Sequence, residues 1–169
     1  AGVKGGLVLV VTDDMEVVAS QERQDSRHYY DFFGGLWFEP NSLKSAYKIA
    51  RNSFFLSEKY DIPVVIRLTN QFFSLNGNYQ TLDKKKRIFL PANNPEKYIV
   101  YPVYWQKQYD NLKNKNKKIN DFVENFTAYS PPNIYASTKG VIVVGSCWKE
   151  YGKNYKGWDK LFIETYPIP

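Results

Sequence analysis

The chain has 169 residues, a formal net charge of +6 and an isoelectric point of about 9.2. Hydrophobic residues make up 43% and aromatic residues 17%, which suffices for a packed core and excludes disorder throughout. The single cysteine, Cys147, excludes an internal disulfide and any multi-cysteine zinc or iron–sulfur site within these residues. No signal peptide is evident and no apolar run approaches the roughly 18–20 residues of a membrane span, so we expect a soluble cytoplasmic protein.

Much of the positive charge is concentrated in two lysine-rich runs, residues 84–87 and 113–118. Asparagines are abundant beside these lysines, which favours a biased but solvated surface over a nucleic-acid patch. Acidic protein partners are a third alternative for the same charge.

The first expected element is a strand over residues 7–12. Five consecutive Leu and Val residues without polar alternation predict a parallel strand buried on both faces. Such a strand needs neighbours on either side, so we expect that it does not begin a self-contained domain. A polar loop over residues 13–28 follows it, with room for a short helix.

Next come a short strand at residues 37–38 and a helix that ends near Tyr60. Asn41 or Ser42 is the expected N-cap, because its side-chain oxygen can accept a bond from a free backbone N–H. Apolar residues at i, i+4, i+7 and i+11 predict the buried face of this helix. These positions are Leu43, Tyr47, Ala50 and Phe54.

A second buried strand is predicted over residues 64–69, after a helix break at Asp61–Pro63. A connection follows over 72–95, then a solvated lysine-rich helix over about 100–126 and a linker at 129–133. The remaining expected elements are a strand at 140–145, a short helix at 147–153 and a strand near 161–163. This order predicts an α/β fold with a mostly parallel sheet.

Polar side chains that follow the first strand are the main candidates for a site. Carboxylates at the C-terminal end of a parallel strand lie where open α/β sheets bind ligands. Asp13 and Asp14 can therefore form a polar clamp, or alternatively cap a helix by accepting from backbone N–H groups. The loop after them is rich in Gln, Arg and Asp, which suit a polar ligand or a salt-bridged subunit interface.

Arginine side chains suit a carboxylate or phosphate ligand, because the planar guanidinium makes bidentate bonds. His28 is the single histidine and has no second metal ligand beside it, and Cys147 has no visible base partner. The sequence therefore assigns no catalytic residue and no metal ligand. The candidates for cofactor or substrate binding are Asp13, Asp14, Gln21, Gln24, Asp25, Arg27, His28 and Arg67.

Five stretches carry a recognisable pattern: GGLVLVVTDD at 5–14, SQERQDSRHYYDF from residue 20, EP at 39–40, LSEKY at 56–60 and PVVIRLT at 63–69. Together they closely resemble the alpha subunits of the indolepyruvate:ferredoxin oxidoreductases, which are thiamine-diphosphate-dependent 2-oxoacid:ferredoxin oxidoreductases. Weaker matches continue at 90–93, 130–131, 140–142 and 166–169. The resemblance spans most of the chain but only part of the family's alpha subunit.

This resemblance implies three parts. Residues 1–70 resemble part of a pyrimidine-type thiamine-diphosphate-binding domain, 71–135 a connecting segment with the lysine-rich helix, and 136–169 the start of a second α/β domain. The implied reaction is oxidative decarboxylation of an aryl-2-oxoacid, such as indolepyruvate, to an acyl-CoA, with electrons passed to ferredoxin. The implied partners are other oxidoreductase subunits, ferredoxin, the small-molecule 2-oxoacid and CoA, with no membrane.

The resemblance also implies that this chain does not act alone. It lacks the Gly-Asp-Gly…Asn stretch that holds the diphosphate and Mg²⁺ in this family, so thiamine diphosphate with its Mg²⁺ would be shared with other chains or segments. Iron–sulfur clusters would also lie elsewhere, because the chain has no cluster of cysteines.

Several positions depart from the family's pattern. Met15-Glu16 stand where the family has Pro-Gly, Arg23 stands for an Asn, and Gln71 stands for the second arginine of the strand-end motif. These departures favour one alternative, a non-catalytic remnant or structural subunit of the family. A basic module that binds nucleic acid or protein through its lysines is the less favoured alternative.

Overall fold

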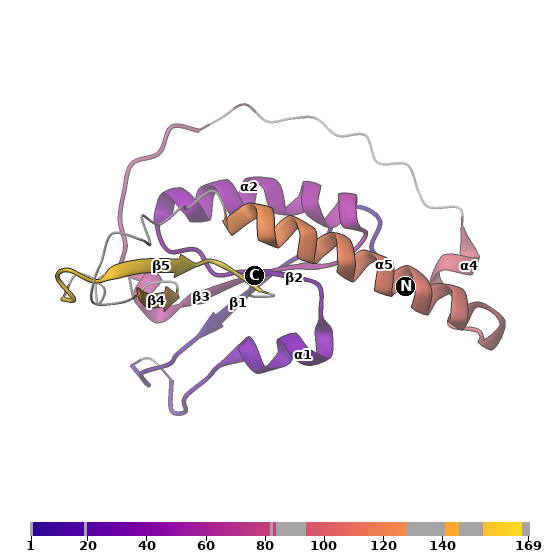
Figure 1. Ribbon diagram of the computed structural model, residues 1–169, viewed down its shortest axis with the longest axis horizontal. Helices are drawn as coiled ribbons and strands as arrows, with labels where there is room; N and C mark the ends of the chain where they lie inside the picture. The colour runs from indigo at the N-terminus through magenta and orange to yellow at the C-terminus, as the bar shows by residue number, and fades with distance from the viewer. Residues whose placement is uncertain are drawn as a thin grey trace.

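A computed structural model describes residues 2–18, 20–81, 83, 94–127, 141–145 and 154–166 of the chain. These residues form an α/β structure in which α2 and α5 lie over one side of a sheet and α1 lies on the other (Figure 1). The predicted fold class is confirmed. The elements are β1 (Val8–Asp13), η1 (Ser26–Tyr29), α1 (Tyr30–Phe33), β2 (Leu36–Phe38), α2 (Leu43–Tyr60), β3 (Val64–Thr69), α3 (Asn70–Phe73), α4 (Pro95–Tyr98), α5 (Pro102–Thr127), β4 (Val141–Gly145), β5 (Asp159–Ile163) and β6 (Thr165–Tyr166).

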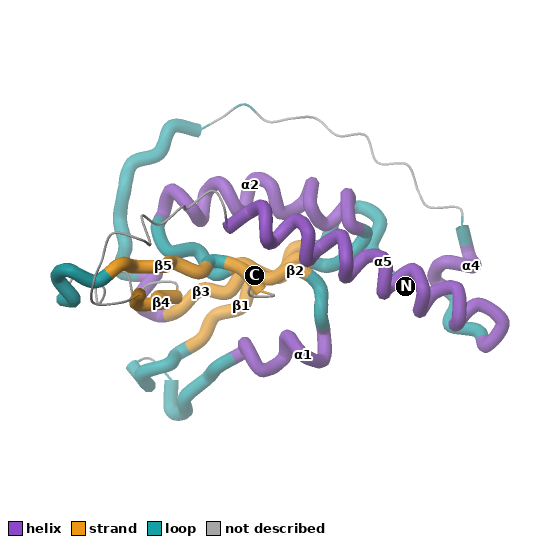
Figure 2. Tube along the Cα trace, in the orientation of Figure 1, coloured by secondary structure: helices purple, strands orange, loops and turns teal. Residues whose placement is uncertain are grey.

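The main sheet has the strand order β1-β3-β2-β6. Figure 2 draws the strands in orange beneath α2 and α5. β1 and β2 both run parallel to β3 on its two sides, so that Val8 and Leu36 are both register partners of Val64. β6 adds to β2 in the antiparallel direction. β4 and β5 form a separate parallel pair. The three parallel strands therefore carry their C-terminal ends to one edge of the sheet.

β3 is the buried strand that the sequence predicts, whereas β1 is not. Leu9 and Val10 of β1 are 40% and 59% exposed, which contradicts the expectation of burial on both faces. Within the described part of the chain β1 pairs with β3 alone and lies at the edge of the sheet. A strand at the edge of the sheet has one side open to solvent, which fits the exposure of its apolar run.

The helix α2 begins and ends where the sequence indicates. The Ser42 side chain accepts a hydrogen bond from the Ser45 N–H at 3.2 Å, which makes Ser42 the N-cap. Asp61 ends the helix in a left-handed conformation with φ of 56°. Glu164, which lies far along the chain, also binds the start of α2. Its carboxylate accepts from the Asn41 N–H at 2.7 Å and from the Ser45 hydroxyl.

The predicted buried face of α2 is wrong. Ala50 and Phe54 are exposed, and the residues that are buried are Ile49, Ser53, Leu56, Ser57 and Tyr60. The two serines can be buried because their hydroxyls donate to backbone carbonyls, Ser53 to Ile49 at 2.7 Å and Ser57 to Ile62 at 2.5 Å. A prediction based on apolar residues alone does not identify these buried serine positions.

The predicted helix over 100–126 is confirmed as α5. Its first half is solvated as expected, but Ile119 and Val123 are 2% and 0% exposed. They pack against buried residues of the sheet and of α2, and Phe122 and Phe126 lie against the same core. The core cluster contains Leu36, Phe38, Ile49, Leu56, Tyr60, Ile62, Val64, Ile66, Ile119 and Val123.

The strands predicted at 140–145 and near 161–163 are found as β4 and β5. The basic run at 84–87, the linker at 129–133, the helix at 147–153 and Cys147 lie outside the described residues. The division at residues 70 and 135 stays a prediction. No helix in the described ranges is both long and apolar enough to cross a membrane.

Candidate functional site

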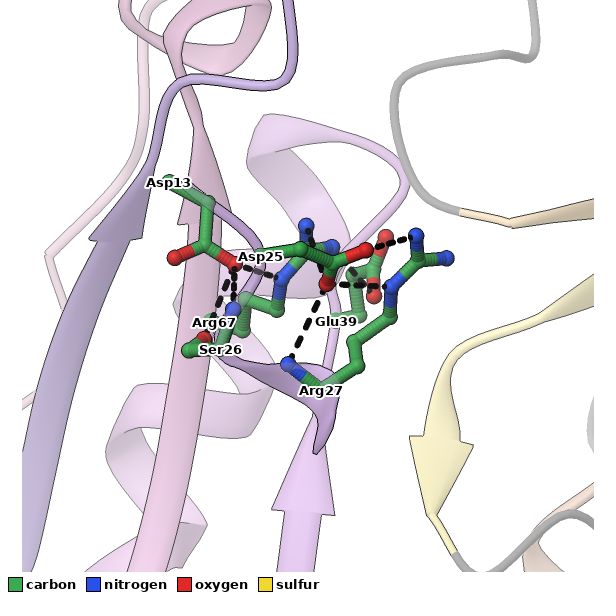
Figure 3. A network of polar contacts seen from close by, with 6 residues as sticks. All are labelled: Asp13, Asp25, Ser26, Arg27, Glu39 and Arg67. Carbon is green, nitrogen blue, oxygen red and sulfur yellow. Dashed lines mark hydrogen bonds and ion pairs between the residues drawn. The ribbon is translucent and has the colours of Figure 1, made fainter. Parts of the chain in front are cut away.

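A buried arginine joins four separate stretches of the chain. Arg67, on β3, is 2% exposed and lies among three carboxylates (Figure 3). Its Nε donates to Asp13 at the end of β1, and its Nη1 lies 2.8 Å from a carboxylate oxygen of Glu39, directly after β2. Its Nη2 lies 3.6 Å from Asp25 in the polar loop. We call these four residues, with Arg27 and Ser26, the Arg67 network.

The parallel register explains why these side chains meet. Arg67 is the register partner of Val11, and Ile66 is the register partner of Phe38. The residues that end β1 and β2 therefore flank the end of β3 at the same edge of the sheet. This is the edge where open α/β sheets bind ligands, as the sequence predicts for Asp13.

Asp13 and Asp14 anchor the polar loop to the sheet. Asp13 accepts from the backbone N–H and hydroxyl of Ser26, the first residue of η1, at 2.7 and 2.9 Å. Asp14 accepts from the N–H groups of Val18 and Ser20 at 3.0 and 2.8 Å, and from the Asn70 amide at 3.0 Å. Both carboxylates accept from backbone N–H groups, but neither caps a helix, because Asp25 is the N-cap of η1 and Val18 and Ser20 lie in the loop.

Asp25 is held by two arginines. Arg27 donates to it through Nε at 2.8 Å and through Nη2 at 2.5 Å, in the bidentate arrangement typical of arginine and carboxylate. These bonds from Arg27 lower the pKa of Asp25 to about 2, while partial burial acts in the opposite direction and the charge of Arg67 adds to the lowering. Asp25 is therefore ionised at neutral pH and has its full charge available to both guanidinium groups.

The network carries more negative than positive charge. Asp13, Asp25 and Glu39 supply three carboxylates, against the two guanidinium groups of Arg27 and Arg67. Buried charges of this kind are stable only when they are paired, and here both cations are already paired internally. An anionic ligand at Arg67 would have to compete with these carboxylates. Within the described residues, the buried Nη2 of Arg67 makes no hydrogen bond.

The other candidates from the sequence do not join this network among the described residues. Gln21, Gln24 and His28 are exposed. No group of three or more His, Cys, Asp or Glu residues in the described ranges could hold a metal ion. Ligand binding by any of the eight candidates stays a prediction.

Glu39 is a network residue that the sequence analysis did not list as a candidate. It is 3% exposed and directly follows β2, as Asp13 ends β1. The rule that selected Asp13, a carboxylate at the C-terminal end of a parallel strand, also selects Glu39 once residues 36–38 are recognised as a central strand.

Two of the departures from the family's pattern contact each other. The Gln71 side-chain amide donates to the Glu16 carboxylate at 2.9 Å, at an exposed position between α3 and the polar loop. Glu16 follows the end of β1, and Gln71 follows the end of β3. The pair therefore lies at the same edge of the sheet as the Arg67 network.

Comparison with known proteins gives one consistent result. Indolepyruvate oxidoreductase subunit IorA of Archaeoglobus fulgidus is 30% identical over 163 residues, which are 95% of this chain and 26% of that protein. IorA of Pyrococcus horikoshii is 34% identical over 110 residues, which are 61% of this chain and 17% of that protein. This chain is related to one segment of IorA. IorA of Methanothermobacter marburgensis is 30% identical over 122 residues, or 70% of this chain and 19% of that protein.

The resemblance read from the motifs is therefore confirmed, and the chain spans about a quarter or less of the IorA subunits that it matches. No protein-family model matches the chain, and no solved structure matches it. Four of the five stretches that carry the motif resemblance contribute residues to the Arg67 network, and the stretch at 56–60 does not.

Proposed function

We propose that the chain is a component of a 2-oxoacid:ferredoxin oxidoreductase of the indolepyruvate type. This enzyme would decarboxylate an aryl-2-oxoacid oxidatively to an acyl-CoA, using thiamine diphosphate, and would pass electrons to ferredoxin in the cytoplasm. The observation that carries the proposal is the convergence of four IorA-like stretches on the buried side chain of Arg67.

In this proposal the chain's own residues shape one edge of the site. Arg67 fixes the ends of β1 and β2 and the polar loop relative to β3. Removing one partner of a buried ion pair typically costs about 3–5 kcal/mol, so this geometry resists displacement when a ligand binds beside it. In this proposal the residues of the chain hold one side of the site in a fixed geometry and do not take part in the reaction.

The described residues do not fit the diphosphate of the cofactor. The Arg67 network has an excess of carboxylates, and its two cations are paired, so an added diphosphate would meet net repulsion. We therefore assign the diphosphate and Mg²⁺ to other chains or segments, together with the iron–sulfur clusters and the binding of CoA and ferredoxin.

The proposal is tested on protein purified from its own source under native conditions. Native mass spectrometry gives the assembly, acid release followed by fluorescence gives the thiamine diphosphate content, and indolepyruvate-dependent reduction of a viologen dye gives the activity. We expect a larger assembly that contains thiamine diphosphate and iron–sulfur clusters. A bare 19.7 kDa species without cofactor would contradict the proposal.

A second candidate function is a structural subunit that has lost the chemistry, and the contact between Glu16 and Gln71 favours it. These two residues stand where the family's pattern has a glycine and an arginine, and the Gln71 amide donates to the Glu16 carboxylate where the family has a second cation. The same purified assembly discriminates the two functions. If it lacks dye reduction and gains it with Glu16→Gly and Gln71→Arg together, the structural subunit is the correct function.

A further inference from the structure

The helix α5 carries apolar residues on the same face of both halves, interrupted by Asn116, and only those of the second half are covered. At 100° per residue, Trp105, Leu112, Ile119 and Val123 point within about 40° of one another. Ile119 and Val123 are 2% and 0% exposed because they pack over the sheet and α2. Figure 1 shows that the first half of α5 extends beyond the end of α2.

In that first half the same face is solvent-exposed and rich in aromatic side chains. We call the exposed part, together with Tyr101 directly before α5, the aromatic stripe, and it consists of Tyr101, Trp105, Tyr109 and Leu112. These side chains are 60%, 59%, 49% and 47% exposed. Contiguous apolar patches of this kind on a protein surface mark interaction sites, and Trp and Tyr are the residues that contribute most at interfaces. The stripe runs for about 16 Å, or three helical turns.

Lysines border the aromatic stripe on both sides. Lys113 stands over the ring of Tyr109, 4.5 Å from its centroid. On the other side, a 390 Å³ pocket between α4 and α5 is lined by four lysines, with Asp61 and Glu96 as the acidic residues. The four are Lys97, Lys107, Lys115 and Lys118. At 100° per residue, Lys115 borders the stripe, whereas Lys107 and Lys118 lie about 160° and 140° from Trp105, toward the opposite face of α5.

The charge of this border decides which partner fits. Residues 107–118 contain five lysines and one aspartate. Asp61 binds both Lys97 and Lys115 at 2.6 Å, so one carboxylate there faces two ammonium groups. Two copies of the chain placed stripe to stripe would bring these positive borders together, which is unfavourable. Negative charge on the partner would complement them.

We propose that the aromatic stripe and its lysine border form a docking surface for an acidic amphipathic helix of another polypeptide. The apolar face of that helix would lie along Trp105 and Tyr109, and its carboxylates would face the bordering lysines. Helices commonly bind proteins in this way, with apolar anchors every three to four residues. This inference is independent of the oxidoreductase chemistry proposed above.

The test uses the full 169-residue chain and a fluorescein-labelled synthetic 16-residue helix with Leu on one face and Glu on the other. Fluorescence anisotropy gives the dissociation constant. We expect the double variant Trp105→Ala/Tyr109→Ala, and Trp105→Gln as a second variant, to weaken binding at least tenfold. Phe32→Ala, at a 92% exposed aromatic position on α1, is the matched control and should change it less than twofold. Replacing the Glu residues of the peptide by Gln, or raising the salt from 50 to 300 mM, should also weaken binding at least tenfold.

Three results would overturn the proposal. The first is equal affinity of the chain for the Glu and Gln peptides, or a loss of peptide affinity in Phe32→Ala as large as that in Trp105→Ala/Tyr109→Ala. The second is a mass of two chains in light scattering that falls to one chain in the Trp105/Tyr109 variant, because a second copy would then cover the stripe. The third is displacement of the peptide by a single-stranded 20-nucleotide DNA at low salt, which would assign the surface to nucleic acid.

Discussion

Replacing Arg67 by methionine tests whether the Arg67 network stabilises the C-terminal ends of the three parallel strands. Methionine keeps most of the side-chain volume but leaves Asp13 and Glu39, which are 5% and 3% exposed, without their cation. Removing one partner of a buried ion pair costs about 3–5 kcal/mol, and a domain of this size loses roughly 2–4 °C in Tm for each kcal/mol. We expect Arg67→Met to lower the midpoint of thermal unfolding by on the order of 10 °C.

The measurement is urea and thermal unfolding followed by far-UV circular dichroism. Arg27→Met is the matched control, because its side chain is 38% exposed and exposed ion pairs contribute about 0–1 kcal/mol. The triple variant Asp13→Asn/Glu39→Gln/Arg67→Met should recover at least half of the loss, since it removes the unpaired charges. A loss for Arg67→Met no larger than that for the control would refute the reasoning.

Three further outcomes follow from the structure. The pKa of Asp25 is lowered in the folded state to about 2 from 3.8. The contribution of Asp25 to stability is therefore present above about pH 4 and is lost as the pH falls toward 2. The free energies of unfolding of Asp25→Asn and of the parent should converge over that range. Ser42→Ala should cost about 1 kcal/mol in urea unfolding through loss of the N-cap, and Lys44→Ala in the same turn should cost less than about half of that. Ile119→Ala should cost about 2–5 kcal/mol, whereas Leu112→Ala on the same face of α5 should cost less than about 1; similar costs would mean that the two halves of the helix are equally covered.

Local signals explain why most of the fold could be predicted from the sequence. The cap at Ser42 and the break at Asp61 fix the ends of α2, and the β-branched run at 64–69 marks β3. The exposure of β1 could not be predicted in this way, because burial depends on which strands lie beside it. The face of α2 could not be predicted either, because Ser53 and Ser57 become compatible with burial only through carbonyls that the fold brings to them.

The candidate site was predictable in part for a similar reason. Asp13 is selected because it ends a predicted strand, and Asp25 because it lies in a loop rich in Gln, Arg and Asp. Glu39 lies between a short strand and a proline, where the sequence gives little sign that the strand is central. The periodicity of apolar residues predicts local structure along the chain. The partners of Arg67 come together only when three strands are aligned in the sheet.

The bond between Glu164 and the start of α2 has a consequence for the order in which the chain folds. Its acceptor oxygen meets the N–H of Asn41 across 123 positions of sequence. Long-range contacts of this kind slow folding, because a large loop must close before they form. During synthesis from the N-terminus, β1, α2 and β3 leave the ribosome well before Glu164 does. Until then the first turn of α2 has the Ser42 cap without Glu164, and β2 lacks its antiparallel neighbour β6.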